Sequence, residues 1–483
     1  MRFELIVIGS GPSGRRAAIQ AAKLGHSVLV VENRLRVGGV SVHTGTIPSK
    51  TLRETVLNLS GWRERGFYGL AYRVKKDIEG KDLGARLRMT LDFEIDVLEH
   101  QFARNGVRTV AGNARFLDPY TIEVTGEEGP VVYEADRFVI AVGTKPYKPP
   151  HIPFDGVRVV DSDALVEEPH VPRSLTVVGA GVIGLEYATI FSALDVPVTI
   201  VEPRTNFLEF IDREIIDEFI HELRRRGVNF RLGCRVDHVE VDAMGWPVAV
   251  LDDHRRIRSE MLLYAAGRVG ATEGLGLESC GLTADERGRL SADPRTFQTV
   301  QPHIYAVGDV IGFPSLASTS MEQGRIAACH AFGASLTEAP DFFPYGIYAV
   351  PEISTIGKTE EQARAEGLHY ECGIAQFRET SRGHIMGLQS GMMKMIFGLE
   401  DRRLLGVHIV GEGATELIHI GQAVLNLGGT LDYFIENTFN YPTLAEAYKI
   451  AALDAFNRMP VTVRETSASH ARGRNASVVS KAG

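Results

Sequence analysis

Cysteine is scarce in this sequence, and its scarcity excludes several kinds of protein. Four cysteines occur in 483 residues, each more than forty residues from the next: Cys234, Cys280, Cys329 and Cys372. No CxxC pair is present for a metal ribbon or a redox motif, and a disulfide scaffold is not expected. HExxH and related histidine–carboxylate spacings are missing as well, so we predict no metal site.

Excess basic charge and long apolar runs are also missing. Lys and Arg number 52 against 61 Asp and Glu, a net charge of −9, which argues against a broad surface for nucleic acid or anionic membranes. The most apolar long stretch, Ser174 to Leu194, is interrupted by glycines and Glu186, so it predicts no membrane span. The apolar run at the start is too short for a signal peptide. We therefore expect a soluble, cytoplasmic protein with no nucleic-acid or membrane partner.

Glycine, in contrast, is abundant, and some of the glycines belong to a sequence pattern that occurs twice. There are 50 glycines, against about 7% in an average protein. Residues 5–14 read Leu-Ile-Val-Ile-Gly-Ser-Gly-Pro-Ser-Gly, and residues 175–184 read Leu-Thr-Val-Val-Gly-Ala-Gly-Val-Ile-Gly. In both copies a second apolar strand ends in a glutamate 23 residues after the first glycine. This pattern is typical of a βαβ dinucleotide-binding unit, present here twice.

Each residue of this pattern has a physical task. The first glycine permits the tight turn, the second lets the backbone approach a pyrophosphate, and the third lets helix and strand pack closely. The phosphates lie at the helix N-terminus, and the glutamate accepts hydrogen bonds from ribose hydroxyls. The predicted binding residues are Gly9, Gly11, Gly14 and Glu32 in the first unit, and Gly179, Gly181, Gly184 and Glu202 in the second.

The second unit carries a mixed signal about its nucleotide. Glu202 favours NAD(H), since a carboxylate binds the 2′-hydroxyl and repels a 2′-phosphate. Arg204, two residues later, is placed to receive that phosphate. The alternative for Arg204 is an ordinary surface charge. A site with both residues suits a protein that binds NAD(H) and NADP(H) in turn.

The fold class follows from the order of these patterns. The length predicts about three domains, and the fold is expected to be α/β, with two Rossmann-like domains and an α+β C-terminal domain. Closing strands are expected at residues 138–144, 261–268 and 303–309. Strands at 391–397 and 404–410 and helices at 414–427 and 444–458 follow.

Further motifs give the sequence a family resemblance. It resembles the flavoprotein disulfide reductases, the group of glutathione reductase and dihydrolipoamide dehydrogenase. The motifs are the segment Gly38–Lys50, Ala141-Val142-Gly143, Gly308-Asp309 and Tyr441-Pro442-Thr443-Leu444-Ala445-Glu446. The resemblance implies an FAD-binding domain in two parts (1–150 and 271–340), an NAD(P)-binding domain (151–270) and an interface domain (341–460). It also implies a homodimer joined through the last of these, with larger assemblies left open; residues 461–483 are expected to be a disordered tail.

The resemblance also implies roles for single residues. Lys50 would lie near the flavin N5 with Glu186 as its ion-pair partner, and Asp309 would bind the ribityl chain or a phosphate. A helix beginning near Ser318 would point its N-terminus at the flavin. The alternatives are a partly exposed helix charge for Glu186 and a turn cap for Asp309. The other FAD contacts implied are Gly39, Thr46, Gly143, Gly308 and Ala317, and the other NAD(P) contact is Gly267.

The departures from the family pattern concern the chemistry itself. Ser41 and Thr46 stand where the family carries its two redox cysteines, and Tyr441 stands where it carries a proton-transferring histidine. A hydroxyl cannot cycle between thiol and disulfide, so a disulfide reductase mechanism is excluded. One branch of the family, the soluble (Si-specific) pyridine nucleotide transhydrogenases, resembles this chain in residues 439–448 and 45–53.

The resemblance to that branch implies a function. The expected enzyme is a flavoprotein oxidoreductase that passes a hydride between NADPH and NAD through FAD, in a ping-pong cycle that needs no thiol. The alternative is an NAD(P)H:quinone or dye reductase on the same fold. A third and less favoured possibility is a flavoprotein without catalytic activity.

Overall fold

The computed structural model describes residues 1–167, 169–335 and 342–464 of the chain. The chain folds into two compact units. Unit 1 consists of Met1–Thr55, Ile78–Gly179 and Val236–Ala339, and unit 2 of Val56–Asp77, Ala180–Arg235 and Pro340–Gly483. Both contain helices and strands in alternation, which confirms the α/β class. The domain boundaries expected from the sequence stay predictions.

The first βαβ pattern forms the centre of a seven-stranded sheet in unit 1. The strand order is β3-β2-β1-β6-β5-β4, with β17 beside β6. Strands β1, β2, β3, β6 and β17 run parallel, and β4 and β5 continue the sheet antiparallel. The strands are β1 (Arg2–Ile8), β2 (Val28–Glu32), β3 (Arg108–Ala111), β4 (Asn113–Asp118), β5 (Thr121–Gly126), β6 (Gly129–Ile140) and β17 (Ile304–Ala306).

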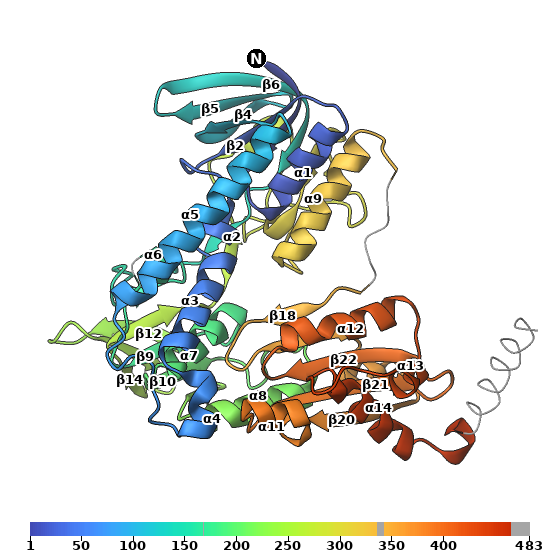
Figure 1. The fold of residues 1–483 in the computed structure, drawn as a ribbon. Helices are drawn as coiled ribbons and strands as arrows, with labels where there is room; N and C mark the ends of the chain where they lie inside the picture. Colours follow the sequence, from blue (N-terminus) through green and yellow to red (C-terminus); the bar gives the residue numbers. More distant parts are fainter. Residues whose placement is uncertain (168, 336–341, 465–483) are drawn as a thin grey trace, which may run out of the picture. The chain divides into compact units, whose positions relative to one another are not determined.

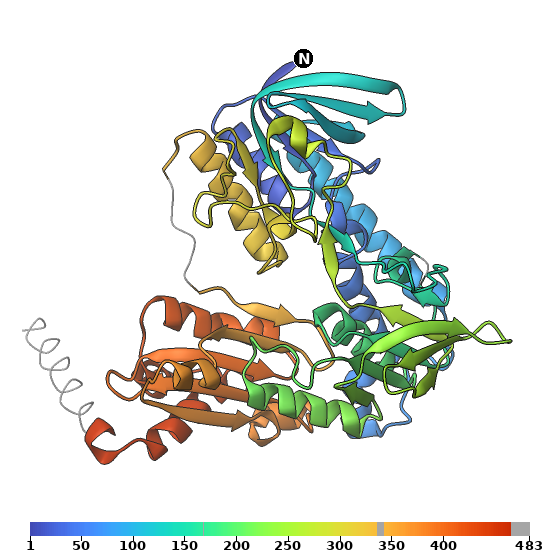
Figure 2. The ribbon, with the colours of Figure 1, turned by 180° about the vertical axis from the view of Figure 1, so that it is seen from behind.

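The central strands are apolar throughout because both faces of this sheet are covered. Leu5 and Val7 belong to one buried apolar cluster, and Ile6 and Ile8 to another. Helices α1 (Pro12–Lys23) and α9 (Ala317–Ala331) lie side by side in both views (Figure 1, Figure 2). They approach so closely that a Cβ on Gly324 would lie 2.0 Å from the carbonyl oxygen of Ser13. The helix expected near Ser318 is α9.

The second βαβ pattern is confirmed in a five-stranded sheet. Its order is β11-β10-β9-β15-β8, and helix α7 connects β9 to β10. The elements are β8 (Val159–Val160), β9 (Leu175–Val178), α7 (Val182–Ala193), β10 (Val198–Glu202), β11 (Asn229–Leu232) and β15 (Met261–Tyr264). A separate three-stranded sheet consists of β12 (Val236–Val241), β13 (Pro247–Leu251) and β14 (Arg256–Arg258).

All three predicted closing strands end earlier than the sequence suggested, and the last of them, β17, ends at Ala306. β6 ends at Ile140, and Thr144 begins a new strand, β7 (Thr144–Pro146). β15 ends at Tyr264, and Arg268 begins β16 (Arg268–Gly270), which pairs antiparallel with β7. The reason is a glycine just before each new strand: Gly143 has φ +66° and Gly267 has φ +128°, and both values turn the chain out of a strand.

The C-terminal part of unit 2 is an antiparallel sheet covered by helices. The strand order is β18-β19-β22-β21-β20. The predicted strands and helices of this region are confirmed within two residues at each end. The elements are β18 (Tyr345–Ile347), β19 (Ile353–Gly357), α10 (Glu360–Ala365), β20 (Tyr370–Gln376), α11 (Ser381–Met386), β21 (Met392–Gly398), β22 (Leu404–Val410), α12 (Ala414–Asn426), α13 (Leu431–Glu436) and α14 (Glu446–Arg458). Of the expected tail 461–483, only residues 461–464 are described, and they are helical.

Further helices complete the two units. They are α2 (Gly39–His43), α3 (Thr46–Leu59), α4 (Arg65–Tyr68), α5 (Gly80–Arg104), α6 (Ala164–Glu167) and α8 (Arg213–Arg225), with short 3₁₀ turns at Trp62–Glu64, Leu277–Cys280, Gly308–Ile311 and Phe377–Glu379.

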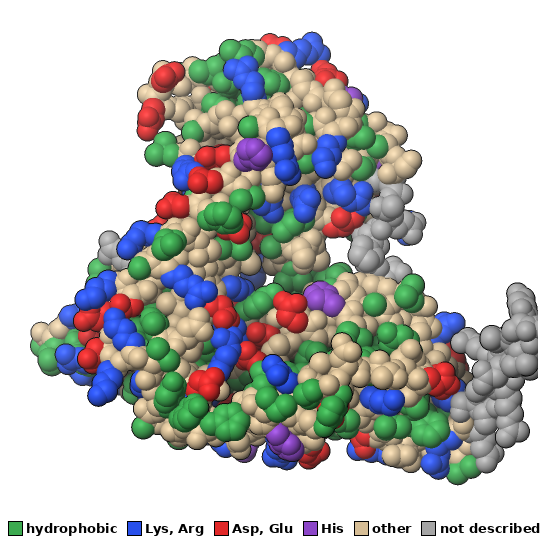
Figure 3. Space-filling model, viewed as in Figure 1, with side chains coloured by type: hydrophobic (Ala, Val, Ile, Leu, Met, Phe, Trp, Pro, Cys, Tyr) green, Lys and Arg blue, Asp and Glu red, His purple; other side chains and the backbone are tan. Residues whose placement is uncertain are grey.

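Positive and negative side chains are interspersed over the face shown in Figure 3. No helix among the described residues is long and apolar enough to cross a membrane. The same residues contain no cluster of three or more His, Cys, Asp or Glu side chains that could hold a metal ion.

A buried ion cluster in unit 2 connects α8 to the C-terminal sheet. Lys394 of β21 has a side chain only 1% exposed, and its Nζ lies 3.0 Å from Asp212 and 2.6 Å from Glu360. Asp212 caps the N-terminus of α8 by accepting the Glu214 N–H. Burial acts to raise the pKa of Asp212, but the neighbouring positive charges outweigh it and the pKa is lowered. The cluster therefore holds its charges by mutual pairing.

Replacing Lys394 by methionine is expected to lower the free energy of unfolding by about 3–5 kcal/mol at pH 7, because the buried Asp212 carboxylate loses its cation. Denaturant unfolding followed by circular dichroism measures the loss. Since the folded-state pKa of Asp212 lies below its ordinary value, the stabilisation is present above about pH 4 and is lost as the pH falls. The difference between wild type and K394M should shrink accordingly.

Lys358 provides the matched control. It forms an ion pair with Glu366 in which the two side chains are 33% and 49% exposed. Lys358→Met is expected to cost less than about 1 kcal/mol, because water screens an exposed pair. A loss at position 394 no larger than the loss at 358 would contradict a stabilising role for the buried cluster.

Candidate functional site

The three glycines of the first βαβ motif, Gly9, Gly11 and Gly14, have different neighbours. A Cβ on Gly9, which has φ +103°, would lie 2.4 Å from the carbonyl oxygen of Ala141, and a Cβ on Gly14 would lie 1.9 Å from that of Gly9. Gly11, the N-cap of α1, has no chain atom within 4 Å of its Cβ position. The packing of the chain explains Gly9 and Gly14, whereas Gly11 faces open space at a helix N-terminus. The N–H groups exposed there suit a pyrophosphate, so the residues present fit FAD.

The second βαβ motif, with Gly179, Gly181 and Gly184, repeats this arrangement. A Cβ on Gly179, at φ +105°, would lie 2.7 Å from the carbonyl oxygen of Ala265, and Gly184 is buried in α7. Gly181 is the N-cap of α7 and again has no chain atom within 4 Å of its Cβ position. A second nucleotide therefore fits this helix N-terminus by the same geometry.

The two glutamates bind the glycine loops in the same way. Glu32 accepts the N–H of Ser10 at 3.1 Å and the N–H of Arg34 at 3.1 Å. Glu202 accepts the N–H of Ala180 at 2.8 Å and the N–H of Arg204 at 3.2 Å. Both carboxylates are buried at the end of the second strand of their unit. The sequence did not predict that these carboxylates also fix the loop.

The first loop has one further contact, through the hydroxyl of Ser10. This hydroxyl donates to Glu32 and accepts the Gly38 N–H at 2.8 Å. A Cβ on Gly39 would lie 2.7 Å from the Cα of Gly11. The segment that begins at Gly38 therefore packs directly against the phosphate-binding loop.

Glu32 and Glu202 are each followed two residues later by an arginine, and the side chains of these arginines differ. Arg204 donates from Nε to Glu202 at 2.7 Å, and its side chain is 57% exposed. Among the described residues, its two terminal nitrogens have no hydrogen-bond partner. Burial acts to raise the pKa of Glu202, but the hydrogen bonds from the Arg204 side chain and from the Ala180 and Arg204 N–H groups, with the Arg204 charge, together outweigh it and the pKa is lowered. Arg204 thus neutralises Glu202 and still offers two donors.

The positions of the family's redox cysteines lie in α2 and α3. The Ser41 hydroxyl donates to the carbonyl oxygen of Gly38 at 3.1 Å, and Thr46 is the first residue of α3. Lys50, one turn later in α3, is half-buried and donates to the Ser49 hydroxyl at 3.3 Å. Ser41 thus serves the local loop geometry.

The four cysteines lie in other elements, and all are free. Burial raises the pKa of Cys280 to about 11 and that of Cys372 to about 12. Such thiols stay protonated at neutral pH and are poor nucleophiles.

Asp309 lies in unit 1 beside the start of α9. Gly308, at φ +80°, donates its N–H to the Gln323 side chain at 2.8 Å, and a Cβ on it would lie 2.5 Å from the Ser13 hydroxyl. Burial raises the pKa of Asp309, and the Arg268 charge and the Ser320 and Thr144 hydroxyls oppose the rise. Ala317, another predicted FAD contact, is the first residue of α9.

Thr144 and Arg268 were not among the predicted site residues. The motif that contains Thr144 and the closing strand that contains Arg268 were both recognised in the sequence. Their proximity to Asp309 depends on the pairing of β7 with β16, which sequence spacing does not reveal.

Glu186 is buried in α7 and accepts the Tyr348 N–H at 3.0 Å. Three residues later, the Thr189 hydroxyl accepts the Val350 N–H at 2.9 Å. The 348–350 segment therefore fixes the orientation of Glu186, and the alternative of a partly exposed helix charge is wrong. Lys50 belongs to unit 1 and Glu186 to unit 2, so their ion pair stays a prediction.

Tyr441 stands at the family's histidine position. Its side chain is 73% exposed, and its hydroxyl lies 2.6 Å from the Ser381 hydroxyl. A phenol hydrogen-bonded to an alcohol does not transfer protons near neutral pH as an imidazole does. Glu446, the other member of the family's pair, is the first residue of α14.

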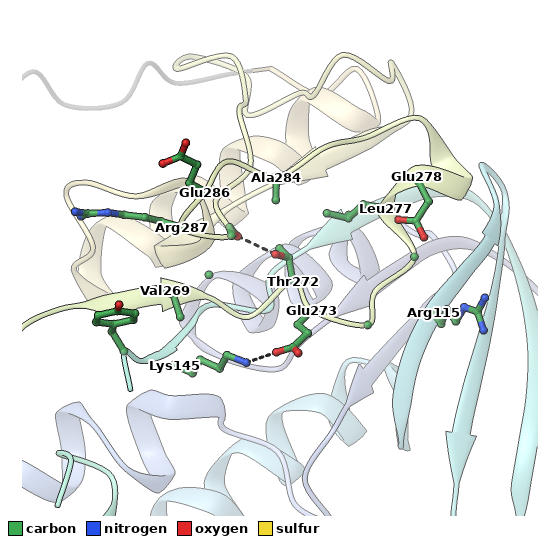
Figure 4. Close-up of a pocket in the computed structure, with 15 residues that line it drawn as sticks. Arg115, Lys145, Val269, Thr272, Glu273, Leu277, Glu278, Ala284, Glu286 and Arg287 are labelled. Carbon is green, nitrogen blue, oxygen red and sulfur yellow. Dashed lines mark hydrogen bonds and ion pairs between the residues drawn. The ribbon is translucent and has the colours of Figure 1, made fainter. Parts of the chain in front are cut away.

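A pocket of about 670 Å³ in unit 1 lies away from these residues. It is lined by the chain from Val269 to Gly288 and by Arg115, and the Lys145–Glu273 ion pair lies at its edge (Figure 4). None of the predicted nucleotide-binding residues lines this pocket.

Comparison with known proteins identifies the family. The profile of the pyridine nucleotide-disulphide oxidoreductases matches residues 3–324, and the profile of their dimerisation domain matches residues 343–452. The chain belongs to this family. Membership implies FAD and NAD(P)H as cofactor and substrate, and the dimerisation domain supports homo-oligomerisation.

Similar members of the family carry a consistent name. A soluble pyridine nucleotide transhydrogenase from Mycobacterium bovis is 48% identical, covering 95% of this chain and 98% of that protein. Proteins of the same name from Marinomonas sp. and Shigella flexneri are 42% and 40% identical, covering 95% of this chain and 99% and 98% of theirs. These values place the chain among relatives that match it over nearly its whole length.

Solved structures show the same family fold. LpdA from Mycobacterium tuberculosis has a TM-score of 0.85 at 26% identity, covering 94% of this chain and 99% of that one. The HOCl-induced flavoprotein disulfide reductase RclA from Escherichia coli has a TM-score of 0.83 at 26% identity, covering 93% and 99%.

Replacing the second glycine of each βαβ motif by alanine should distinguish the binding site for FAD from the binding site for NAD(H). Gly11→Ala adds a methyl group where no chain atom lies, at a backbone conformation that alanine adopts freely. We expect an unchanged melting temperature for the apoprotein and FAD affinity weakened by about 1–3 kcal/mol, roughly ten- to a hundred-fold. Release of FAD on dilution, followed by fluorescence, measures the change.

Gly181→Ala is the matched variant in the second βαβ motif. It should leave FAD affinity unchanged and weaken NAD(H) by a similar factor, as measured by titration of the holoenzyme. Equal loss of FAD in both variants would contradict the assignment of one nucleotide to each unit.

Proposed function

We propose that this chain is an FAD-dependent enzyme that moves a hydride between NADPH and NAD⁺ without a redox disulfide. In one direction NADPH loses a hydride to become NADP⁺, and NAD⁺ gains a hydride to become NADH, so charge and electrons balance with no proton taken from water. The chemistry that FAD supplies when bound is reversible hydride uptake. Three relatives that are 40–48% identical carry the name soluble pyridine nucleotide transhydrogenase, which supports the proposal. We propose Si-specific transfer as part of the same function.

The observation that carries the proposal is the pair Ser41 and Thr46. Reduction of a disulfide by this family requires two thiols at these positions, and two hydroxyls cannot accept electrons. Tyr441 removes the proton-transferring group that thiol chemistry requires. Hydride transfer between nicotinamides needs neither group, so both departures agree with this function.

Glu202 and Arg204 of the second βαβ motif account for the use of both NADP(H) and NAD(H). When NADPH binds, Arg204 can offer its terminal nitrogens to the 2′-phosphate while its Nε neutralises Glu202. When NAD(H) binds, Glu202 can accept the 2′-hydroxyl. The Glu202–Arg204 pair thus provides for either ribose in one site.

Lys50 and Glu186 are our proposed catalytic residues, as an ion pair beside the reacting rings. Burial makes an unpaired Glu186 costly, and the Tyr348 N–H already fixes one of its oxygens. The FAD contacts are proposed to be those predicted from the sequence.

The assembly and location belong to the same proposal. We propose a homodimer joined through residues 341–460 and a cytoplasmic enzyme whose partners are small nucleotides. The match to a dimerisation domain and the word "soluble" in the names of the relatives support this.

Hydride transfer is tested with NADPH and thio-NAD⁺, whose reduced form absorbs at a longer wavelength than NADPH. FAD-loaded protein is expected to reduce thio-NAD⁺ at a rate that a benzoquinone in its place does not exceed. Reductive titration without oxygen should consume two electrons per FAD, because no disulfide takes up a second pair. Reduction of the quinone alone, or uptake of four electrons, would overturn the proposal.

Arg204→Ala should discriminate between the nucleotides. It removes a charged donor from the 2′-phosphate and leaves Glu202 unneutralised, so the KM for NADPH should rise about ten- to a hundred-fold while that for NADH stays unchanged or falls. Steady-state kinetics with each donor measure the ratio.

The internal repeat supplies the control. Arg34 holds the equivalent position in the first βαβ motif, where its N–H also donates to Glu32. Arg34→Ala should leave the ratio of the two KM values unchanged. If Arg204→Ala raises both KM values equally, the phosphate role is wrong.

A further inference from the structure

Arg226, the C-cap residue of α8, joins two other segments of unit 2. Its Nη1 donates a hydrogen bond to the carbonyl oxygen of Val350, in the segment between β18 and β19. Its Nη2 donates to two groups of α7, the carbonyl oxygen of Thr189 at 3.4 Å and the Ser192 hydroxyl at 3.3 Å. The guanidinium group therefore bridges α7 and the 348–350 segment.

The same two segments also meet at Glu186. The Tyr348 N–H donates to the Glu186 carboxylate at 3.0 Å. The Val350 N–H donates to the Thr189 hydroxyl at 2.9 Å, and this hydroxyl donates to the carbonyl oxygen of Glu186 at 3.0 Å. Val350 thus gives its N–H to α7 and its carbonyl oxygen to Arg226. Because Val350 is held on both sides, the Tyr348 N–H two residues earlier is held in place as well.

Arg226 is a cation that has no ion-pair partner among the described residues. Its Nε is buried, and in the same part of the chain this atom has no hydrogen-bond partner. Burial lowers the pKa of Arg226 to about 10, so the group is still charged at neutral pH. Its Cζ lies 4.4 Å from the centre of the Trp62 ring, a cation–π contact. The ring and the hydrogen bonds to Val350 and α7 therefore compensate the cost of burying this charge.

We propose that Arg226 is a positioning residue for hydride transfer, which holds the Glu186 carboxylate in its orientation through the 348–350 segment. The inference rests on the proposed function, in which Glu186 lies beside the reacting rings. Arg226 fixes Val350, and the Tyr348 N–H carries the effect to the carboxylate. Misplacing a group at a reacting centre by about 1 Å can slow a reaction roughly a hundred-fold. Loss of the Arg226 bridge should therefore slow hydride transfer to FAD.

The first test measures hydrogen–deuterium exchange in the FAD-loaded protein. Arg226→Met removes the bridging hydrogen bonds and leaves no carboxylate without its cation, because Arg226 has no ion-pair partner among the described residues. Amide exchange in a peptide of residues 348–352 should become about ten-fold faster, because the segment opens more often. A peptide of residues 392–397, from β21, should exchange as in wild type.

Arg225 provides the matched control for Arg226. It precedes Arg226 in the chain, its side chain is 56% exposed, and it forms an ion pair with Glu222 within α8. Arg225→Met removes the same charge from the same helix end without touching the 348–350 segment. Exchange in both peptides should therefore equal that of wild type.

The second test measures the reduction of FAD by NADH in a stopped-flow instrument, without oxygen or a second acceptor. Arg226→Met should lower the limiting rate about ten-fold and change the Kd for NADH less than about two-fold, because the Gly181 loop and Glu202 are untouched. Arg226→Lys keeps a charged donor and should restore part of the rate. Arg225→Met should reduce FAD at the wild-type rate.

A double variant tests whether Arg226 acts through Glu186. Glu186→Ala should lower the limiting rate at least as much as Arg226→Met, and adding Arg226→Met to Glu186→Ala should cause little further loss. Thr189→Val removes the acceptor of the Val350 N–H and should lower the rate in the same direction. It tests the same segment without changing any charge.

Three outcomes would overturn the inference. They are a limiting rate of Arg226→Met within about two-fold of wild type, unchanged exchange of the 348–352 peptide, and full addition of the losses from Arg226→Met and Glu186→Ala. If Arg226→Met does not fold, the first two criteria apply to Arg226→Lys and Thr189→Val. The kinetic readout ends at reduced FAD. A protein that reduces FAD but transfers no hydride to NAD⁺ would therefore refute the proposed function and leave this inference standing.

Discussion

Both glycine loops of this protein are held by the same interaction, a buried glutamate that accepts an N–H from the loop. Glu32 holds Ser10, and Glu202 holds Ala180. The bond ties the end of the second strand to the turn after the first strand, so the loop is fixed before a ligand arrives. The open side of Gly11 or Gly181 follows from that fixed loop. Preorganisation of this kind lowers the cost of ordering a binding site.

The sequence predicts this part well because its requirements are local. Tight turns, the close packing of Gly14 against Gly9, and a carboxylate at a strand end are all encoded within about thirty residues. The hydrogen bonds from Arg268 to Thr144 and the contact of Glu186 with Tyr348 join residues more than a hundred positions apart. No spacing rule relates such residues, so only the folded chain reveals them. The split of two predicted strands at Gly143 and Gly267 was missed for a related reason, since a positive φ is not readable from an apolar run.

The chemistry of the site is defined as much by substituted residues as by retained ones. Ser41 now completes a loop hydrogen bond with Gly38, and burial keeps the thiols of Cys280 and Cys372 protonated. The chain thus carries both βαβ motifs, and the hydroxyls of Ser41 and Thr46 cannot carry electrons to a disulfide. A flavin bound to such a chain has a nicotinamide as its natural partner in both half-reactions.

The pairing of β7 with β16 brings together two points of the chain that are 122 positions apart. Pro146 lies opposite Arg268 in this two-stranded sheet. The chain from residue 147 to residue 267 therefore begins and ends at one place. A short bridge could join the two strands directly at a small entropic cost, because they are already neighbours and the entropy of closing a short loop is small.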